Sequence, residues 1–99
     1  MVKWTGHAKA QLRHIYDYVA QDSATYAKRV TQELVNRSLS LDELPRAGKV
    51  VAELNNELVR EVSLYSYRIL YEIKHEVIEV LAVIHKRRDV QADEIPRGE

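Results

Sequence analysis

The sequence predicts an α+β fold in which an antiparallel sheet packs on an N-terminal helical hairpin, in the order β-α-α-β-β-β. Up to about residue 42, apolar residues recur every three or four positions, which is typical of helices with one buried face. After Gly48 the period changes to two, which is typical of strands. A chain of 99 residues has the length of a single domain, 1–99.

The first half of the chain is expected to form a short strand and then two helices. Val2–Trp4 is apolar and β-prone, and Thr5 and Ser23 belong to the residue types that cap helix N-termini. Helical spacing of apolar residues starts at Ala8, resumes after Ser23 and ends near Asp42. Because so few residues separate the two helices, they must run roughly antiparallel.

The second half is expected to form a meander of strands joined by tight turns. The predicted strands are Val50–Leu54, Leu58–Leu64, Tyr67–Ile73 and Val77–His85. The predicted turns are Asn55-Asn56, Tyr65-Ser66 and His75-Glu76. Pro45 and Gly48 separate this meander from the second helix, and residues 90–99 are expected to form a loose tail.

Two-residue turns determine which side chains share a face of the sheet. One face should pack on the helices, and it carries Val62, Leu64, Tyr67, Ile69, Tyr71, Ile73, Ile78, Val80, Ala82 and Ile84. The other face is mixed, with Leu70 opposite Leu81 and Arg68 opposite Val83. No helix remains to cover Leu70, Leu81 and Val83, so we expect an exposed stripe that binds a partner. The alternative is that the carboxy-terminal tail covers these three side chains.

Composition excludes several classes of protein. Lys plus Arg and Asp plus Glu both number 15, so a strongly basic coat for nucleic acid is excluded. The absence of cysteine excludes disulfides, zinc–thiolate sites and thiol nucleophiles. No apolar run is long enough to span a bilayer or to serve as a signal peptide, which predicts a cytoplasmic protein. We expect neither a metal nor a cofactor.

A basic cluster ends the longest predicted strand and comprises His85, Lys86, Arg87 and Arg88. Its cations are suited to phosphate oxygens, and an imidazole can act as acid or base near neutral pH. The alternative is a solvated strand end that Asp89 partly neutralises.

Arg68 is also unusual, because it lies in the middle of a strand between apolar residues. A salt bridge to Glu61 or Glu72 would explain it, and a Glu53–Arg60 pair would explain Arg60. As a catalytic set, Glu53, Arg60, Arg68 and His85 would supply a base, a phosphate clamp and an acid, which suits RNA cleavage.

Over roughly residues 2–90, the chain resembles the RelE/ParE toxin superfamily. The most specific segments are the YRILYEI strand, Tyr67–Ile73, and the V-x-H-x-R-R-D ending, Val83–Asp89. Pro45 and Gly48 match the P-x-x-G loop of ParE-type members. The resemblance implies the toxin of a bacterial type II toxin–antitoxin module, which a ParD-like or similar antitoxin neutralises.

The two branches of the superfamily act differently. The resemblance implies DNA gyrase as the target for a ParE-like toxin, and messenger RNA in the ribosome for a RelE-like toxin. The long helical hairpin and the HKRRD ending favour the ParE branch. The absence of an aromatic residue after Tyr71 also favours it, because many nuclease members place one just after the last strand.

We therefore predict a gyrase-binding toxin without catalytic residues. A ribosome-dependent endoribonuclease using Glu53, Arg60, Arg68 and His85 is the second interpretation, and a degenerate toxin active only in autoregulation is the third. The target is expected to contact Arg68, His85, Lys86, Arg87 and Arg88. The antitoxin is expected to contact Leu70, Leu81 and Val83.

Overall fold

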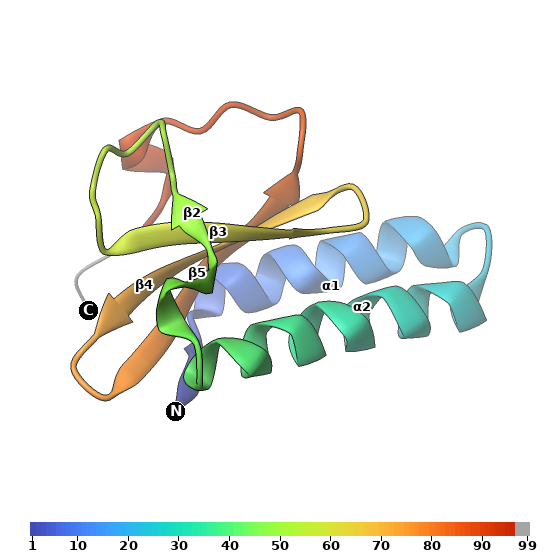
Figure 1. The fold of residues 1–99 in the computed structure, drawn as a ribbon. Helices are drawn as coiled ribbons and strands as arrows, with labels where there is room; N and C mark the ends of the chain where they lie inside the picture. The colour runs from blue at the N-terminus through green and yellow to red at the C-terminus, as the bar shows by residue number, and fades with distance from the viewer. Residues whose placement is uncertain (97–99) are drawn as a thin grey trace.

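The computed structural model describes residues 1–96 and places a helical hairpin on one face of a sheet, with loops on the other face (Figure 1). Within these residues the sheet has five strands in the order β1-β5-β4-β3-β2. The strands are β1 (Val2–Trp4), β2 (Lys49–Val50), β3 (Val59–Leu64), β4 (Tyr67–Lys74) and β5 (Val77–His85). The α+β class and the packing of the helical hairpin on the sheet are confirmed, with four strands after the helices, one more than the predicted order β-α-α-β-β-β counts. The sheet is mixed rather than purely antiparallel, because β1 runs parallel to β5.

The two helices begin at the predicted caps. The hydroxyl of Thr5 accepts the Ala8 N–H at 3.0 Å at the start of α1 (Gly6–Ala20). Ser23 caps α2 (Ala24–Leu39) in the same way, and 3₁₀ turns follow at Ser40–Asp42 and Pro45–Ala47. No helix in residues 1–96 has both the length and the apolar character needed to cross a membrane.

The predicted turns around β4 are confirmed. Tyr65, the first residue of its turn, has a φ of 56°, and Glu76, the second residue of its turn, has a φ of 59°, so each turn contains one residue with a positive φ. They set the expected pairs of Leu64 with Tyr67 and of Ile73 with Ile78. The side chains predicted for the helix-facing side between Val62 and Val80 do pack in the core beneath the helices.

A β-bulge at Leu81 corrects the predicted faces of β5 beyond it. Leu70 pairs with Ala82 and the next residue, Tyr71, pairs with Val80, so Leu81 is the extra residue. The alternation of faces therefore inverts after Leu81. Val83 packs in the helix-side core, whereas Ala82 and Ile84, predicted on that side, pack on the opposite face. Arg68 lies opposite Ile84 rather than Val83.

The strand predicted at Val50–Leu54 is shorter than expected and ends at Val50. The N–H groups of Leu54 and Asn55 both donate to the Val51 carbonyl, so the chain curls away from the sheet. Asn55 has a φ of 48° within this curl. The loop carries Val51 and Leu54 over the second face of the sheet, where they pack in its apolar cluster.

The expectation that Leu70, Leu81 and Val83 form an exposed stripe is wrong. Their exposed fractions are 0%, 0% and 2%. Val83 lies under the helices, while Leu70 and Leu81 are covered by the β2–β3 loop and by Val90 and Ile95. The alternative, a tail folded over this face, is the one the structure supports. The described part of the tail is therefore not loose, and residues 97–99 lie outside the described residues.

Gly48 lies at a close approach between the loop after α2, strand β3 and the Tyr71 side chain. Its N–H donates to the Tyr71 hydroxyl at 3.0 Å, and that hydroxyl donates to the Pro45 carbonyl at 2.6 Å. A β-carbon at Gly48 would lie 2.5 Å from the Glu61 carbonyl oxygen and 2.7 Å from the Tyr71 hydroxyl. Gly48 therefore allows the loop after α2 to lie directly against β3 and the buried Tyr71 ring.

Gly48→Ala should destabilise the protein by about 1–3 kcal/mol, because a methyl group would have to displace buried backbone. Gly6→Ala is the matched control, since a β-carbon there meets nothing within 4 Å. Urea unfolding of both variants measures the difference. Equal stabilities would contradict the close approach at Gly48.

Candidate functional site

Arg68 is the best-satisfied polar side chain on the second face of the sheet. Its Nε and Nη2 donate to Glu61 at 2.8 and 3.0 Å, and its Nη1 and Nη2 donate to Glu53 at 3.0 Å each. Nη1 also donates to the Arg88 carbonyl at 3.0 Å. A guanidinium has five N–H donors, and all five are used here. The salt bridge to Glu61 is confirmed.

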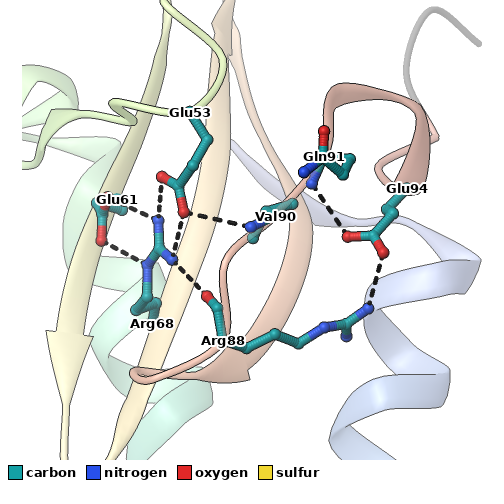
Figure 2. A network of polar contacts seen from close by, with 7 residues as sticks. All are labelled: Glu53, Glu61, Arg68, Arg88, Val90, Gln91 and Glu94. Carbon is teal, nitrogen blue, oxygen red and sulfur yellow. Dashed lines mark hydrogen bonds and ion pairs between the residues drawn. The ribbon is translucent and has the colours of Figure 1, made fainter.

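Glu53 joins this network to the tail, as Figure 2 shows. One of its oxygens accepts from Arg68 and also from the Val90 N–H at 3.3 Å. The hydrogen bonds from Arg68 lower the pKa of Glu53 to about 2, and those from Glu53 raise the pKa of Arg68. Glu53 is therefore a carboxylate committed to Arg68, which leaves it poorly suited to act as a general base.

The tail has its own polar contacts beyond this network. Arg88 pairs with Glu94 at 3.3 Å, and the Gln91 N–H donates to the same carboxylate at 3.1 Å (Figure 2). A short 3₁₀ helix, Ala92–Glu94, follows Gln91 and brings Ile95 onto the apolar face. These contacts make residues 88–95 a strap, anchored at both ends, across the second face.

Arg60 does not pair with Glu53 as predicted. Its Nη1 donates to the Gly48 carbonyl at 2.9 Å and its Nε donates to the Glu57 carbonyl at 3.0 Å. The prediction failed because it placed Glu53 in a regular strand, whereas Glu53 lies in the curled loop. Arg60 instead ties that loop to the residues before β2.

His85 lies on the helix side of the sheet, away from Arg68. It pairs across β4 with Tyr67, and the two rings meet edge to face at 6.0 Å. Its Nδ1 accepts the Arg87 N–H at 3.1 Å, which leaves Nε2 to carry the proton of the neutral ring. Regular alternation along the predicted strand Val77–His85 would place His85 on the same face as Arg68, but the bulge at Leu81 inverts the alternation.

The structure therefore does not bring together the four residues predicted for RNA cleavage. Glu53 and Arg68 meet, but each satisfies the other. An open cleft of about 700 Å³ lies over them and is also lined by Lys49 and Lys86. Arg68 was predicted to clamp a phosphate of the target, but all of its N–H groups already donate within the protein. Arg68 is therefore poorly placed to contact a target.

Lys86 and Arg87 are exposed cations of the predicted basic cluster, just after the end of β5. No side-chain ion pair is found for either of them within residues 1–96. Arg88 is exposed too, but it is paired with Glu94. The unpaired positive charge at this end of the sheet therefore comes from Lys86 and Arg87 among the described residues.

A second hollow was not foreseen from the sequence. It is an open groove of about 790 Å³ between the helical hairpin and the end of the sheet. Its walls include four tyrosines, namely Tyr18, Tyr26, Tyr65 and Tyr67. The available signal was composition, because the chain has six Tyr and no Phe. Among the described residues, no group of three His, Asp or Glu side chains is arranged to hold a metal ion.

Comparisons with known proteins agree with this architecture. Residues 2–90 match the family model described as the ParE toxin of the type II toxin–antitoxin system parDE. The chain is 31% identical over 87 residues to Toxin RelE2 of Caulobacter vibrioides, covering 88% of this chain and 96% of that protein.

Two solved structures share the fold. One is the chromosomal ParDE toxin–antitoxin system of P. aeruginosa, with a TM-score of 0.71 and 25% identity, covering 85% of this chain and 92% of that one. The other is the RelBE2 toxin–antitoxin complex of Mycobacterium tuberculosis, with a TM-score of 0.65 and 22% identity, covering 86% and 95%.

Arg68→Met should destabilise the fold by about 3–5 kcal/mol, because Glu61 would be left buried and without its cation. Arg13→Met is the control, since Arg13 forms an exposed pair with Asp17 and its loss should cost under about 1 kcal/mol. Chemical unfolding measures both. If Arg68→Met kept full stability and lost only activity, Arg68 would be a target contact after all.

The stability that Glu53 contributes should depend on pH. Its pKa is about 2 in the fold against an ordinary 4.5, so its contribution is complete above pH 4.5 and is lost as pH falls toward 2. We expect the difference in free energy of unfolding between wild type and Glu53→Gln to narrow by about 1–2 kcal/mol over that range. This figure is smaller than the full pKa shift implies, because Glu53 is partly exposed to solvent. Urea unfolding at stepped pH tests this, and a constant gap would contradict it.

Proposed function

Because the chain belongs to the ParE toxin family of type II toxin–antitoxin systems, we propose that it arrests growth by binding DNA gyrase and not by cutting RNA. The observation that carries the proposal is the saturated Arg68 guanidinium. A guanidinium with no free N–H cannot clamp a phosphate. The nearby Glu53 carboxylate is ionised, but its charge is balanced by the same guanidinium. A toxin that acts by binding its target needs neither a free phosphate clamp nor a general base.

The docking surface that we propose for gyrase is the end of β5, where Lys86 and Arg87 are exposed. Exposed charges at the rim of an interface act mainly on association rate and orientation. The proposal also includes a cognate antitoxin as partner, as in the two solved toxin–antitoxin structures. A cytoplasmic location is part of the same proposal.

Ribosome-dependent cleavage of messenger RNA is the second candidate. The observation in its favour is the similarity to a protein named Toxin RelE2. In that case His85 would be the reacting group, because its imidazole is exposed at the end of β5. His85→Ala would then abolish cleavage, since a general acid or base typically contributes about 10²–10⁴-fold in rate.

The double variant Lys86→Glu, Arg87→Glu should inhibit gyrase at least about tenfold more weakly than wild type, because it reverses the charge of the proposed docking surface. Its matched control is Lys9→Glu, Lys28→Glu, which makes the same charge change on exposed positions of the helical hairpin. Plasmid supercoiling by purified gyrase, with growth arrest on induction, measures both.

A parallel assay of translation-dependent messenger cleavage separates the two candidates. The gyrase proposal fails if two results are seen together. The first is that wild-type protein cuts ribosome-bound messenger RNA while gyrase still supercoils DNA, and the second is that cells expressing His85→Ala grow normally. It also fails if wild-type protein affects neither process, which is the behaviour of a toxin active only in autoregulation.

A further inference from the structure

The cations proposed for docking lie on a short exposed turn, residues 86–88, which follows β5 and which we call the docking turn. Lys and Arg side chains have long stems with several rotatable bonds, so their charged ends can point in many directions. Only the backbone can limit where such side chains start and which way they leave the surface. The conformation of the docking turn therefore determines where its cations are presented.

Every N–H group of the docking turn has an acceptor within the protein. The Lys86 N–H donates to the Ser66 carbonyl at 2.8 Å, and the Arg88 N–H donates to the His85 carbonyl at 3.1 Å. The remaining N–H, that of Arg87, donates to the imidazole of His85, whose Nδ1 accepts it at 3.1 Å. An exposed turn with all of its donors satisfied has a defined conformation before it meets a partner.

The far end of the docking turn is held from inside the sheet. The Arg88 carbonyl accepts from the buried Arg68 guanidinium at 3.0 Å (Figure 2). Of the groups that hold the turn, backbone carbonyls do not titrate and a guanidinium keeps its charge. The His85 imidazole is the member of this set that changes its protonation near neutral pH.

The contact between His85 and Arg87 has the spacing of an Asx turn, in which a side-chain acceptor receives the N–H group two residues further on. A neutral imidazole can take this role because one ring nitrogen has a free lone pair while the other carries the proton. An imidazolium has a proton on both nitrogens and cannot accept. His85 therefore holds the docking turn only in its neutral form.

The surroundings of His85 bear on which form it adopts. The ring borders the groove of about 790 Å³ described above, the tyrosine groove. The other titratable and charged side chains of its walls are His14 and Tyr18 of α1, Tyr26 of α2, Tyr65, Tyr67 of β4 and Arg88. No carboxylate is found among the described residues that line it. None of these neighbours can therefore form an ion pair with a protonated His85.

We propose that His85 is a positioning residue for the docking turn, an inference that rests on the gyrase-binding function proposed above. Its unprotonated Nδ1 holds the Arg87 N–H and so sets the directions in which Lys86 and Arg87 leave the surface. Two other roles for the ring are alternative outcomes of the test. One is general acid or base in RNA cleavage, and the other is packing alone, through the edge-to-face contact with Tyr67.

The variants His85→Asn and His85→Phe separate these roles. Asn keeps an acceptor for the N–H two residues on but has no ring, whereas Phe keeps a ring against Tyr67 but has no acceptor. We expect His85→Phe to inhibit gyrase about 3–10-fold more weakly than wild type, the effect of losing about one hydrogen bond, and His85→Asn to stay within about twofold. The same substitutions at His75, exposed in the β4–β5 turn at the other end of β4, are matched controls and should act like wild type.

The opposite ranking overturns the proposal. If His85→Asn loses inhibition and His85→Phe keeps it, the ring acts by packing. If both variants lose cleavage of ribosome-bound messenger RNA by about 100-fold or more, the ring is a general acid or base.

The pH dependence supplies a readout that packing would not change. An imidazole takes up a proton as the pH falls from about 8 to about 5, so wild-type protein should bind purified gyrase more weakly toward the acid end of that range. His85→Asn, measured beside it at each pH, corrects for changes in gyrase itself and should not show the extra loss. Wild-type protein that binds more tightly at low pH relative to His85→Asn would make the ring a further docking cation and overturn the positioning role.

The free protein tests the same assignment apart from the gyrase function. Nitrogen NMR of the His85 ring should show the tautomer with its proton on Nε2. The Arg87 amide should exchange with solvent faster in His85→Phe than in wild type or His85→Asn, while the Lys86 amide, held by Ser66, is the internal reference. A proton on Nδ1, or equal exchange of the Arg87 amide in all three proteins, overturns the proposal. If the ring and the amide behave as expected but wild-type protein does not inhibit gyrase, the gyrase function fails and the contact between His85 and the turn stands.

Discussion

Arg68 places a buried positive charge beside the apolar cluster on the second face of the sheet, and much of the second half of the fold is arranged around it. A guanidinium there would be very costly without partners. Its partners come from three places: β3 supplies Glu61, the loop after β2 supplies Glu53, and the tail supplies the Arg88 carbonyl. One side chain thereby fixes two irregular segments that have little regular hydrogen bonding of their own.

Apolar burial and the Arg68 hydrogen bonds contribute differently to the stability of this region. Apolar burial by Val90 and Ile95 holds the strap on the sheet, while the Arg68 network sets where the strap begins. Ion pairs of this kind add modest net stability but exclude alternative arrangements, because any shift leaves a charge unpaired. We infer that Arg68 acts chiefly in conformational specificity, because all of its N–H groups are used by partners within the fold.

Regular elements were predictable from the sequence because their signals are local. Thr5 and Ser23 mark the helix starts, and the turns at Tyr65 and Glu76 set the register of three strands. The bulge at Leu81 was not predictable in this way, because Val80 to Ile84 are all apolar and an inverted alternation leaves no trace in such a run. One extra residue then moved His85 to the other face of the sheet.

The position of Glu53 and the tyrosine groove escaped prediction for a different reason. Both depend on how irregular or distant segments lie in space, which periodicity does not describe. Arg68 with Glu61 could be expected from strand register, whereas Arg68 with Glu53 depends on the curl at Val51. The interpretation of the family was robust to these errors, since it rested on strand and loop motifs that stay in place.

The pairing of β1 with β5 has a consequence for how the protein forms. These strands are the first and last of the sheet in the chain, yet they are neighbours, with Val2 beside Ile78. Synthesis from the ribosome therefore releases the helical hairpin long before the strand that completes its apolar face. Contacts so distant in sequence fold slowly, and the waiting intermediate exposes its apolar surface. The sheet therefore cannot be completed before β5 has been synthesised, and a chain that stops before Val77 lacks the strand that joins β1 to β4.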